Sequence, residues 1–264
     1  MSNMILRVFR NELSKHWRTK LPYFGIVASG LVCLLAFAVT ARQGGDVVNG
    51  WGYVSMSMQM VFSDIGPLFV VVFAAMLIAE ETGSGTVRVV LSCPVGRWEF
   101  YIAKVMTGLL YALIVSLSSL VISFCLGAVQ YTFGEVSDSI GLIYAKKEVI
   151  SNIVAALLLS WLPLAAVVLF GIFISTLIRK SGQAVAVAIG SISLLDLTKH
   201  LLGIESYVFT RYLGSSWGVF NQVAQGVDYQ WFPGVWKMAG VSIAYIIVLF
   251  TAGLLVFSRR DFNG

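Results

Sequence analysis

Charged residues are scarce in this chain of 264 residues. Asp, Glu, Lys and Arg make up 12% of it, whereas a soluble domain carries about 25%. Hydrophobic residues make up 58%, and the mean hydropathy is +0.86. So few charges cannot cover the surface of a water-soluble fold of this length. The composition therefore excludes a soluble domain and indicates an integral membrane protein.

Cysteine and histidine are also rare. Cys33 and Cys125 lie inside apolar stretches and Cys93 lies in a short polar segment, so no disulfide framework is predicted. His16 and His200 are far apart in the sequence. The sequence therefore predicts no metal site built from His and Cys.

Six apolar stretches are long enough to cross about 30 Å of hydrocarbon, which takes about 20 helical residues. We predict spans at about 21–41, 58–79, 105–130, 151–178, 181–197 and 238–258. The first stretch also resembles a signal peptide, because Val39-Thr40-Ala41 resembles a cleavage site. Its apolar part is longer than a typical signal sequence, which favours a retained span.

The basic residues predict the orientation. A net charge of +5 would also suit a nucleic-acid partner, but these residues gather beside the apolar stretches, which is typical of membrane topology signals. Twelve of the 18 Lys and Arg residues fall on the side of the two chain ends. We therefore expect both termini in the cytoplasm and no nucleic-acid partner.

Residues 1–20 predict a helix that lies in the headgroup layer of the membrane. Leu6, Phe9, Leu13 and Trp17 recur at spacings of three and four, as on one face of a helix. The opposite face is polar and basic, with Arg7, Arg10, Asn11, Ser14, Lys15 and Arg18. The alternative is a topology signal with no further role, which would not need the apolar stripe.

The segment 198–237 is rich in aromatic residues and is the longest predicted segment outside the spans. Such side chains favour the membrane interface. We expect the segment to lie against or dip into the outer leaflet, as short helices broken at Gly214, Gly226 and Pro233-Gly234. The alternative is an aromatic belt that anchors the ends of the last two spans.

The segment 80–104 is the most informative loop, and it reads EETGSGTVRVVLSCPVGRWEFYIAK. Gly83 and Gly85 are expected to end the second span, Cys93-Pro94 to stop a short amphipathic segment, and Trp98 to begin the helix of the third span. A charged and firmly shaped segment between two spans is typical of a docking surface. Its residues do not form the pattern of a nucleophile or a metal site.

This loop resembles the signature of ABC-2-type permeases, the membrane subunits of one class of ABC transporter. The signature runs from an acidic residue through Gly-Thr, apolar residues and Pro-x-x-Arg to a Lys that opens the third span. It is carried here by Glu81, Gly85-Thr86, Leu91, Pro94-Val95-Gly96-Arg97 and Lys104. Gly83 departs from the pattern, since many relatives carry a second acidic residue there.

The resemblance implies an all-α membrane protein with six transmembrane helices, an N-terminal interfacial helix and a type V exporter-like architecture. It also implies a bacterial inner or plasma membrane, two copies of a cytosolic ABC ATPase subunit, and a second permease that is either another copy or a relative. The implied function is ATP-driven export of a hydrophobic or amphipathic substrate such as a drug, a lipid or an antimicrobial peptide. The implied ATPase-coupling residues are Glu80, Glu81, Gly85, Thr86, Arg88, Pro94, Arg97 and Lys104.

The chain itself lacks the G-x-x-x-x-G-K-[ST] sequence that cradles nucleotide phosphates. We therefore expect no catalytic residue and no cofactor in this chain, and we expect ATP to act through the partner subunit. The main alternative is an ion-coupled secondary transporter, which would show an inverted repeat or paired ionisable residues near the middle of the membrane. The sequence shows no clear repeat.

Two acidic residues, Asp64 and Asp196, fall inside predicted spans toward their outer ends. A charge inside a span costs about 2.5–3.5 kcal/mol at the membrane centre. Either acid pairs with Lys199 or Arg211, or it lines an outer vestibule of the transport path. Small residues four apart allow close helix packing, either within one subunit or between two, at Ser119, Ser123 and Gly127 and at Gly182, Ala186 and Gly190.

Overall fold

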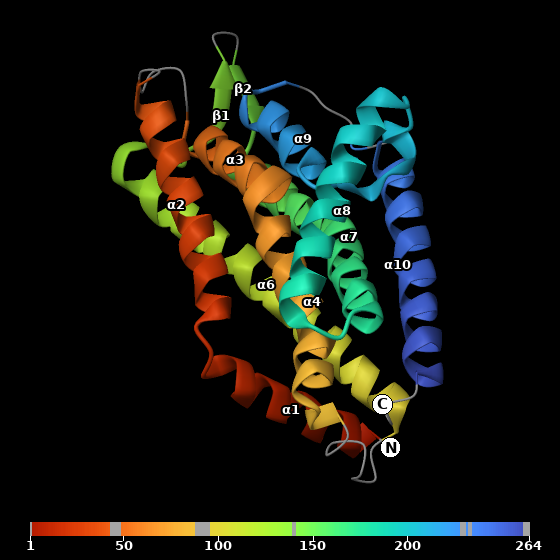
Figure 1. Cartoon of the computed structure of the whole chain (residues 1–264). Helices are drawn as coiled ribbons and strands as arrows, with labels where there is room; N and C mark the ends of the chain where they lie inside the picture. The colour runs from red at the N-terminus through yellow and green to blue at the C-terminus, as the bar shows by residue number, and fades with distance from the viewer. Residues whose placement is uncertain are drawn as a thin grey trace.

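The computed structural model describes residues 2–42, 49–87, 96–138, 141–227, 231 and 234–260. Within these ranges, six helices are long and apolar enough to cross a membrane. They pack as a helical bundle, and both chain ends lie at the same end of it (Figure 1). We call this the α1 end and the opposite one the hairpin end. The predicted membrane-embedded helical architecture is confirmed at this level.

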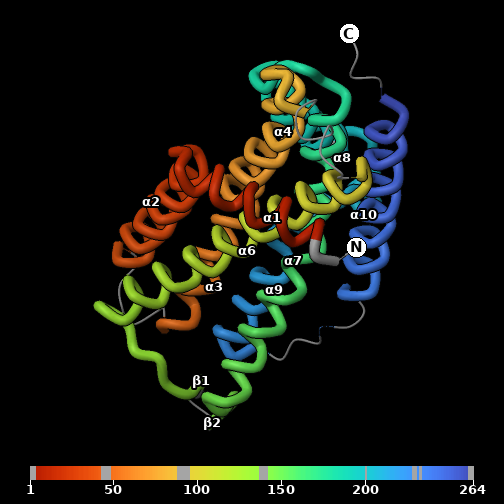
Figure 2. The backbone as a smooth tube through the Cα atoms, turned by 90° about the horizontal axis from the view of Figure 1, so that it is seen from below, coloured from red at the N-terminus to blue at the C-terminus, as the bar shows by residue number. Residues whose placement is uncertain are grey.

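Helix α1 covers Ser2–Trp17 and lies across the α1 end of the bundle (Figure 2). The long helices are α2 (Leu21–Arg42), α3 (Gly50–Met60) with η1 (Val61–Ile65) and α4 (Gly66–Ser84), α6 (Arg97–Gln130), α7 (Lys146–Leu177), α8 (Ser181–Leu201) and α10 (Gly234–Arg259). The shorter elements are β1 (Val136–Asp138), β2 (Gly141–Tyr144), η2 (Glu205–Tyr207), η3 (Phe209–Tyr212) and α9 (Ser215–Ala224).

Several helices extend beyond the apolar stretches that predicted them, because polar side chains cap their first turns. The second span starts at Gly50 rather than near residue 58, and α3, η1 and α4 continue as one helical rod to Ser84. Asn49 Oδ1 accepts the N–H of Gly52 at 2.7 Å at its start. At the start of α6, Glu99 Oε2 accepts the N–H of Gly96 at 2.9 Å. Such caps satisfy N–H groups that a helix cannot pair internally.

A two-stranded antiparallel hairpin, β1–β2, lies between α6 and α7 and corrects the all-α prediction. Ser137 pairs with Leu142 in its register. Strands of three and four residues are too short to show an alternating hydrophobic pattern. The sequence therefore gave no signal for them.

Helices α4 and α7 approach closely at Gly171 and form the centre of the core. A Cβ atom at Gly171 would lie 2.7 Å from the Cβ of Ala74, so no larger residue fits there. One turn further, Ser175 Oγ accepts the N–H groups of Ile78 at 3.0 Å and Ala79 at 2.8 Å. Close packing and these hydrogen bonds fix α7 against α4.

The aromatic segment after α8 packs into the bundle at the hairpin end rather than serving only as an outward belt. Phe209, Trp217 and Phe220 are fully buried. Helix α9 begins after Gly214 and is followed by Gly226, whose φ of 79° is left-handed. These two breaks agree with the sequence prediction. Burial accounts for Phe209, Trp217 and Phe220, whereas Tyr207 and Trp236 of the same segment are exposed.

The two rows of small residues have different surroundings. Ser119, Ser123 and Gly127 are buried inside this subunit, where the hydroxyl of Ser57 donates to Ser123 Oγ at 2.7 Å. On α8, Gly182, Ala186 and Gly190 are exposed. Nothing described lies within 4 Å of a Cβ placed at Gly182 or Gly190. The first row therefore packs within the chain, and the second is left uncovered by it.

Candidate functional site

Three helices bring a group of ionisable side chains together at the α1 end of the bundle. We call this group the α1 charge cluster, and its members are Glu12, Lys15 and His16 of α1, Glu81 of α4 and Lys104 of α6. Lys104 is fully buried, and Glu12 and Glu81 are only 6% and 4% exposed. Ionised groups are this deeply buried only when they are paired.

Lys104 is the centre of the cluster. Its Nζ donates to Glu12 Oε2 at 2.5 Å and to Glu81 Oε1 at 2.6 Å, and it lies 5.1 Å from the centre of the Phe100 ring. Lys15 Nζ reaches Glu81 Oε1 at 3.3 Å from the more exposed side. A single buried ammonium group thus ties α1 to both α4 and α6.

The cluster forms because the face of α1 that lies between its apolar stripe and its basic residues turns toward the protein, while Arg7, Asn11 and Ser14 stay exposed. Val8, Glu12 and His16 recur every four residues and are all buried. Leu6 and Trp17 of the predicted apolar stripe are 63% and 72% exposed. Phe9 and Leu13 of the same stripe are only partly exposed, and Phe9 packs against the core. A stripe whose two ends are exposed suits a helix whose outer side contacts lipid.

Electrostatics within the cluster hold Glu12 ionised. Burial alone raises its pKa, but the nearby ring of His16, whose Nε2 lies 3.4 Å from Glu12 Oε2, and the charge and hydrogen bond of Lys104 outweigh burial and hold the pKa at about 2. Burial likewise lowers the pKa of Lys15, and the carboxylates of Glu81 and Glu80 raise it above its ordinary value. The folded cluster therefore favours the charged form of each of these groups.

In the predicted coupling segment 80–104, some of the described residues are buried within helices and others are exposed. Glu81 and Lys104 belong to helices α4 and α6, and they are buried instead of exposed on a loop, because they pair with each other. Gly85 ends α4 with a left-handed φ of 74°, and Thr86 beside it is exposed. Glu80 is partly exposed. Arg88 and Pro94 lie outside the described residues.

Arg97 links the far end of this segment to α10. Its guanidinium donates to the carbonyl oxygens of Ser258 at 2.6 Å and Arg260 at 3.2 Å. Cations stabilise the carbonyl-rich C-terminal end of a helix. Arg260 in turn donates to the carbonyl oxygen of Thr176 near the end of α7. The start of α6 is therefore connected to the ends of two further long helices.

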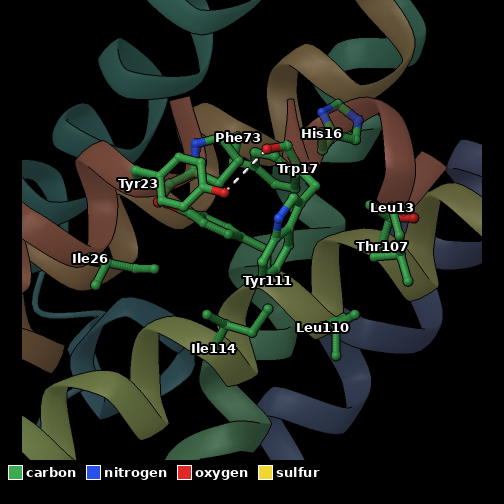
Figure 3. Close-up of a pocket in the computed structure, with 11 residues that line it drawn as sticks. Leu13, His16, Trp17, Tyr23, Ile26, Phe73, Thr107, Leu110, Tyr111 and Ile114 are labelled. Carbon is green, nitrogen blue, oxygen red and sulfur yellow. Dashed lines mark hydrogen bonds between the residues drawn. The ribbon is translucent and has the colours of Figure 1, made fainter. Parts of the chain in front are cut away.

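An apolar cavity of about 110 Å³ lies at the elbow between α1 and α2 (Figure 3). Its walls include Trp17, Tyr23, Phe73 and Tyr111, and the hydroxyl of Tyr23 donates to the carbonyl oxygen of Trp17 at 3.1 Å. Among its described lining residues there is no Asp, Glu, Lys or Arg, but the ring of His16 from the α1 charge cluster reaches it.

A larger cleft of about 460 Å³ brings together the two acids predicted inside the spans. Asp64 comes from η1 and Asp196 from α8, and we call the space between them the acidic cleft. Its lining is completed by Ser63, Ile65, Pro67, Leu68, Val71, Ile189, Ile192, Ser193, Leu197, Thr210 and Leu213. The sequence identified both acids but gave no signal that they share one space.

Lys199 and Arg211, the two cations predicted as partners for these acids, bind different carboxylates in the structure. Lys199 donates to Asp196 one helical turn away. Arg211 instead donates to Glu205 at 2.6 Å. The hydrogen bonds and ion pairs of the described residues give Asp64 no cationic partner. The described residues also contain no group of three His, Cys, Asp or Glu side chains placed to hold a metal ion.

Two comparisons relate the chain to known proteins. It is 24% identical over 221 residues to the uncharacterized protein YhcI of Bacillus subtilis (strain 168), in an alignment that covers 81% of this chain and 66% of that protein. The chain thus spans slightly less than two thirds of the length of that relative. A family model described as "Protein of unknown function (DUF2705)" matches residues 21–263, which is nearly the whole chain. The chain belongs to the DUF2705 family.

Proposed function

We propose that this protein is the membrane permease subunit of an ATP-driven transporter of the ABC-2 type, and that it exports a hydrophobic or amphipathic substrate. The observation that carries the proposal is the α1 charge cluster. Glu81 and Lys104 are the first and last residues of the signature-like segment, and their pairing holds α4, α6 and α1 together at the base of that segment. A cytosolic ATPase that moves the segment would therefore move all three helices.

Further contacts connect these three helices to the last span. Arg97 attaches the start of α6 to the end of α10, so force applied there also reaches the last span. Rigid helices joined by paired charges are suited to transmit a rigid-body movement. In this proposal the exposed residue Thr86 and the partly exposed Glu80 face the ATPase, while Glu81 and Lys104 act inside the permease.

The proposed orientation places the α1 end in the cytoplasm. A cysteine introduced at exposed Gln225, near the hairpin end, is expected to react with an impermeant thiol reagent added to intact cells. A cysteine at exposed Ser14 in α1 is expected to react only after the cells are opened. Reaction at position 14 in intact cells would reverse the orientation and remove the ATPase from this end.

The function is tested by purifying the tagged chain in detergent and identifying copurifying proteins by mass spectrometry. We expect a protein with a G-x-x-x-x-G-K-[ST] sequence, and vanadate-sensitive ATP hydrolysis by the complex. As a matched pair, Thr86→Lys should lower recovery of that protein, while Thr132→Lys, an exposed site near the hairpin end, should not. Absence of any ATPase from active, transport-competent preparations would refute the proposal.

A second candidate is an ion-coupled carrier, and the acidic cleft is the observation in its favour. It places two carboxylates in one space, as such carriers require. This candidate predicts transport driven by an imposed proton or sodium gradient in vesicles without ATP. The ABC proposal predicts no transport under those conditions.

A further inference from the structure

We infer that the acidic cleft binds the positively charged group of an amphipathic amine, so that the protein selects cationic over anionic ligands. The inference rests on the proposed function only in calling this ligand a transport substrate. The binding site itself is argued from the cleft.

The cleft has the size and the lining of a site for a drug-sized molecule. Its volume of about 460 Å³ falls within the range of about 300–1,000 Å³ of small-molecule sites. Most of its walls are aliphatic, from residues such as Leu68, Val71, Ile189 and Ile192. A ligand that fills this space must therefore carry an apolar body.

The charges of the lining are of one sign. Among the described residues of the lining, Asp64 and Asp196 are the only ionisable ones and none is basic. Lys199 offsets one of the two negative charges through its bond to Asp196. The charge of Asp64 remains, in a span where an uncompensated charge is costly. A cationic ligand would remove that cost, whereas an anionic ligand would increase it.

Thr210 supplies an independent indication of a polar ligand. It lines the cleft, is only 5% exposed, and its hydroxyl has no hydrogen-bond partner among the described residues. A buried hydroxyl without a partner is costly, and native structures rarely keep one without a reason. An ammonium group between Asp64 and Thr210 would donate to both, which a quaternary ammonium group could not do.

The backbone places Asp64 at a suitable depth and in an unusual local structure. It lies in the π-helical segment η1, and π-helical turns inside α-helices occur frequently at functional sites. At about 1.5 Å per residue, Asp64 is about 25 Å along the rod from Glu81, and Asp196 is about 22 Å along α8 from Ser181. Both acids therefore lie at a similar distance from the α1 end of the bundle.

The test uses two fluorescent probes that share one body and differ in charge. Dansylcadaverine ends in a primary ammonium group, and dansyl-6-aminohexanoate ends in a carboxylate. Binding is measured by fluorescence on the purified full chain in lipid nanodiscs, with empty nanodiscs subtracted. We expect the amine to bind at least about tenfold more tightly than the carboxylate.

Variants locate the charge and the hydroxyl. Asp64→Asn and Asp196→Asn keep the side-chain shape, and each should weaken amine binding about tenfold or more. Thr210→Val should weaken it severalfold. Glu135→Gln removes an exposed acid that does not line the cleft and should leave binding unchanged. Thermal unfolding of each variant confirms that the chain stays folded, since Asp64→Asn removes a charge from a span and should not lower stability.

Equal binding of the two probes, no binding of either, or wild-type affinity in Asp64→Asn would overturn the inference. No ATPase is present in this measurement. If the proposed ABC function is wrong, no ATPase will copurify, but charge-selective binding will remain. Failure of the binding inference would appear as lost charge selectivity, whatever partner copurifies.

Discussion

Replacing Lys104 by Met tests whether the α1 charge cluster holds the base of the bundle together. Methionine keeps most of the length and apolar volume of the lysine side chain and removes only its charge. The change leaves Glu12 and Glu81 buried and deprived of the ammonium group that lies 2.5 and 2.6 Å from their oxygens. The effect therefore measures the electrostatics of the cluster and not a cavity.

The magnitude follows from the burial of all three groups. Removing one partner of a buried ion pair costs about 3–5 kcal/mol, because the remaining charge is left uncompensated. Lys104 is fully buried and serves two carboxylates, so we expect the upper part of this range. A loss of about 4 kcal/mol lowers the unfolding temperature by roughly 8 °C or more, at about 2–4 °C per kcal/mol for chains of 150–250 residues.

The assay is thermal unfolding of the detergent-purified chain, with Lys147→Met as the control. Lys147 is exposed at the start of α7, and its replacement should change the unfolding temperature little. The triple variant Lys104→Met, Glu12→Gln, Glu81→Gln should recover much of the loss, since it removes the uncompensated charges together. An unchanged unfolding temperature in Lys104→Met would refute the argument that this cluster is structurally important.

Three further predictions address other contacts of the same structure. Folding lowers the pKa of Glu12 from 4.5 to about 2. Its contribution to stability should therefore be complete above about pH 4.5 and be lost as the pH falls toward 2. Unfolding temperatures measured across this range should fall less in Glu12→Gln than in the unchanged chain. Arg97→Glu should weaken both the α10 attachment and ATPase recovery in pull-downs, whereas Arg97→Lys keeps a cation near the α10 carbonyl groups and should preserve more of each. Gly171→Leu should lower the unfolding temperature by forcing α4 and α7 apart, whereas Gly240→Leu, where nothing lies within 4 Å, should not; equal effects would contradict the close packing inferred at Gly171.

The spans were predictable because the membrane sets a length and a polarity that a single stretch of sequence must satisfy by itself. The breaks at Gly85, Gly214 and Gly226 were predictable for a similar reason, since local glycine chemistry ends a helix. The start of the second span at Gly50 was not predictable from local sequence. It depends on Asn49, which caps the helix and also donates to the carbonyl oxygen of Ala224, 175 residues later.

The acidic cleft also could not be predicted from the sequence. Asp64 and Asp196 stood out individually, because a charge inside an apolar span is costly wherever it points. Their approach depends on how α8 packs against the rod formed by α3, η1 and α4, and nothing local in either segment encodes that packing. Thr210 gave no signal at all in the sequence, because a threonine in a short helical turn such as η3 becomes unusual only when it is buried without a partner.

The α1 charge cluster shows why amphipathic patterns need care at a membrane surface. In a soluble protein the apolar stripe of a helix faces the core, so Leu6, Phe9, Leu13 and Trp17 would have been assigned to the protein side. At a membrane the apolar stripe has a second apolar environment in the lipid, and the residues beside that stripe are free to turn inward if the bundle offers charges to pair with them. Lys104, at the start of the third span, is such a charge, and Glu12 of α1 pairs with it. An acid and a histidine four residues apart, between the apolar stripe and the basic face, were therefore the available signal that α1 binds the bundle through the face that carries them.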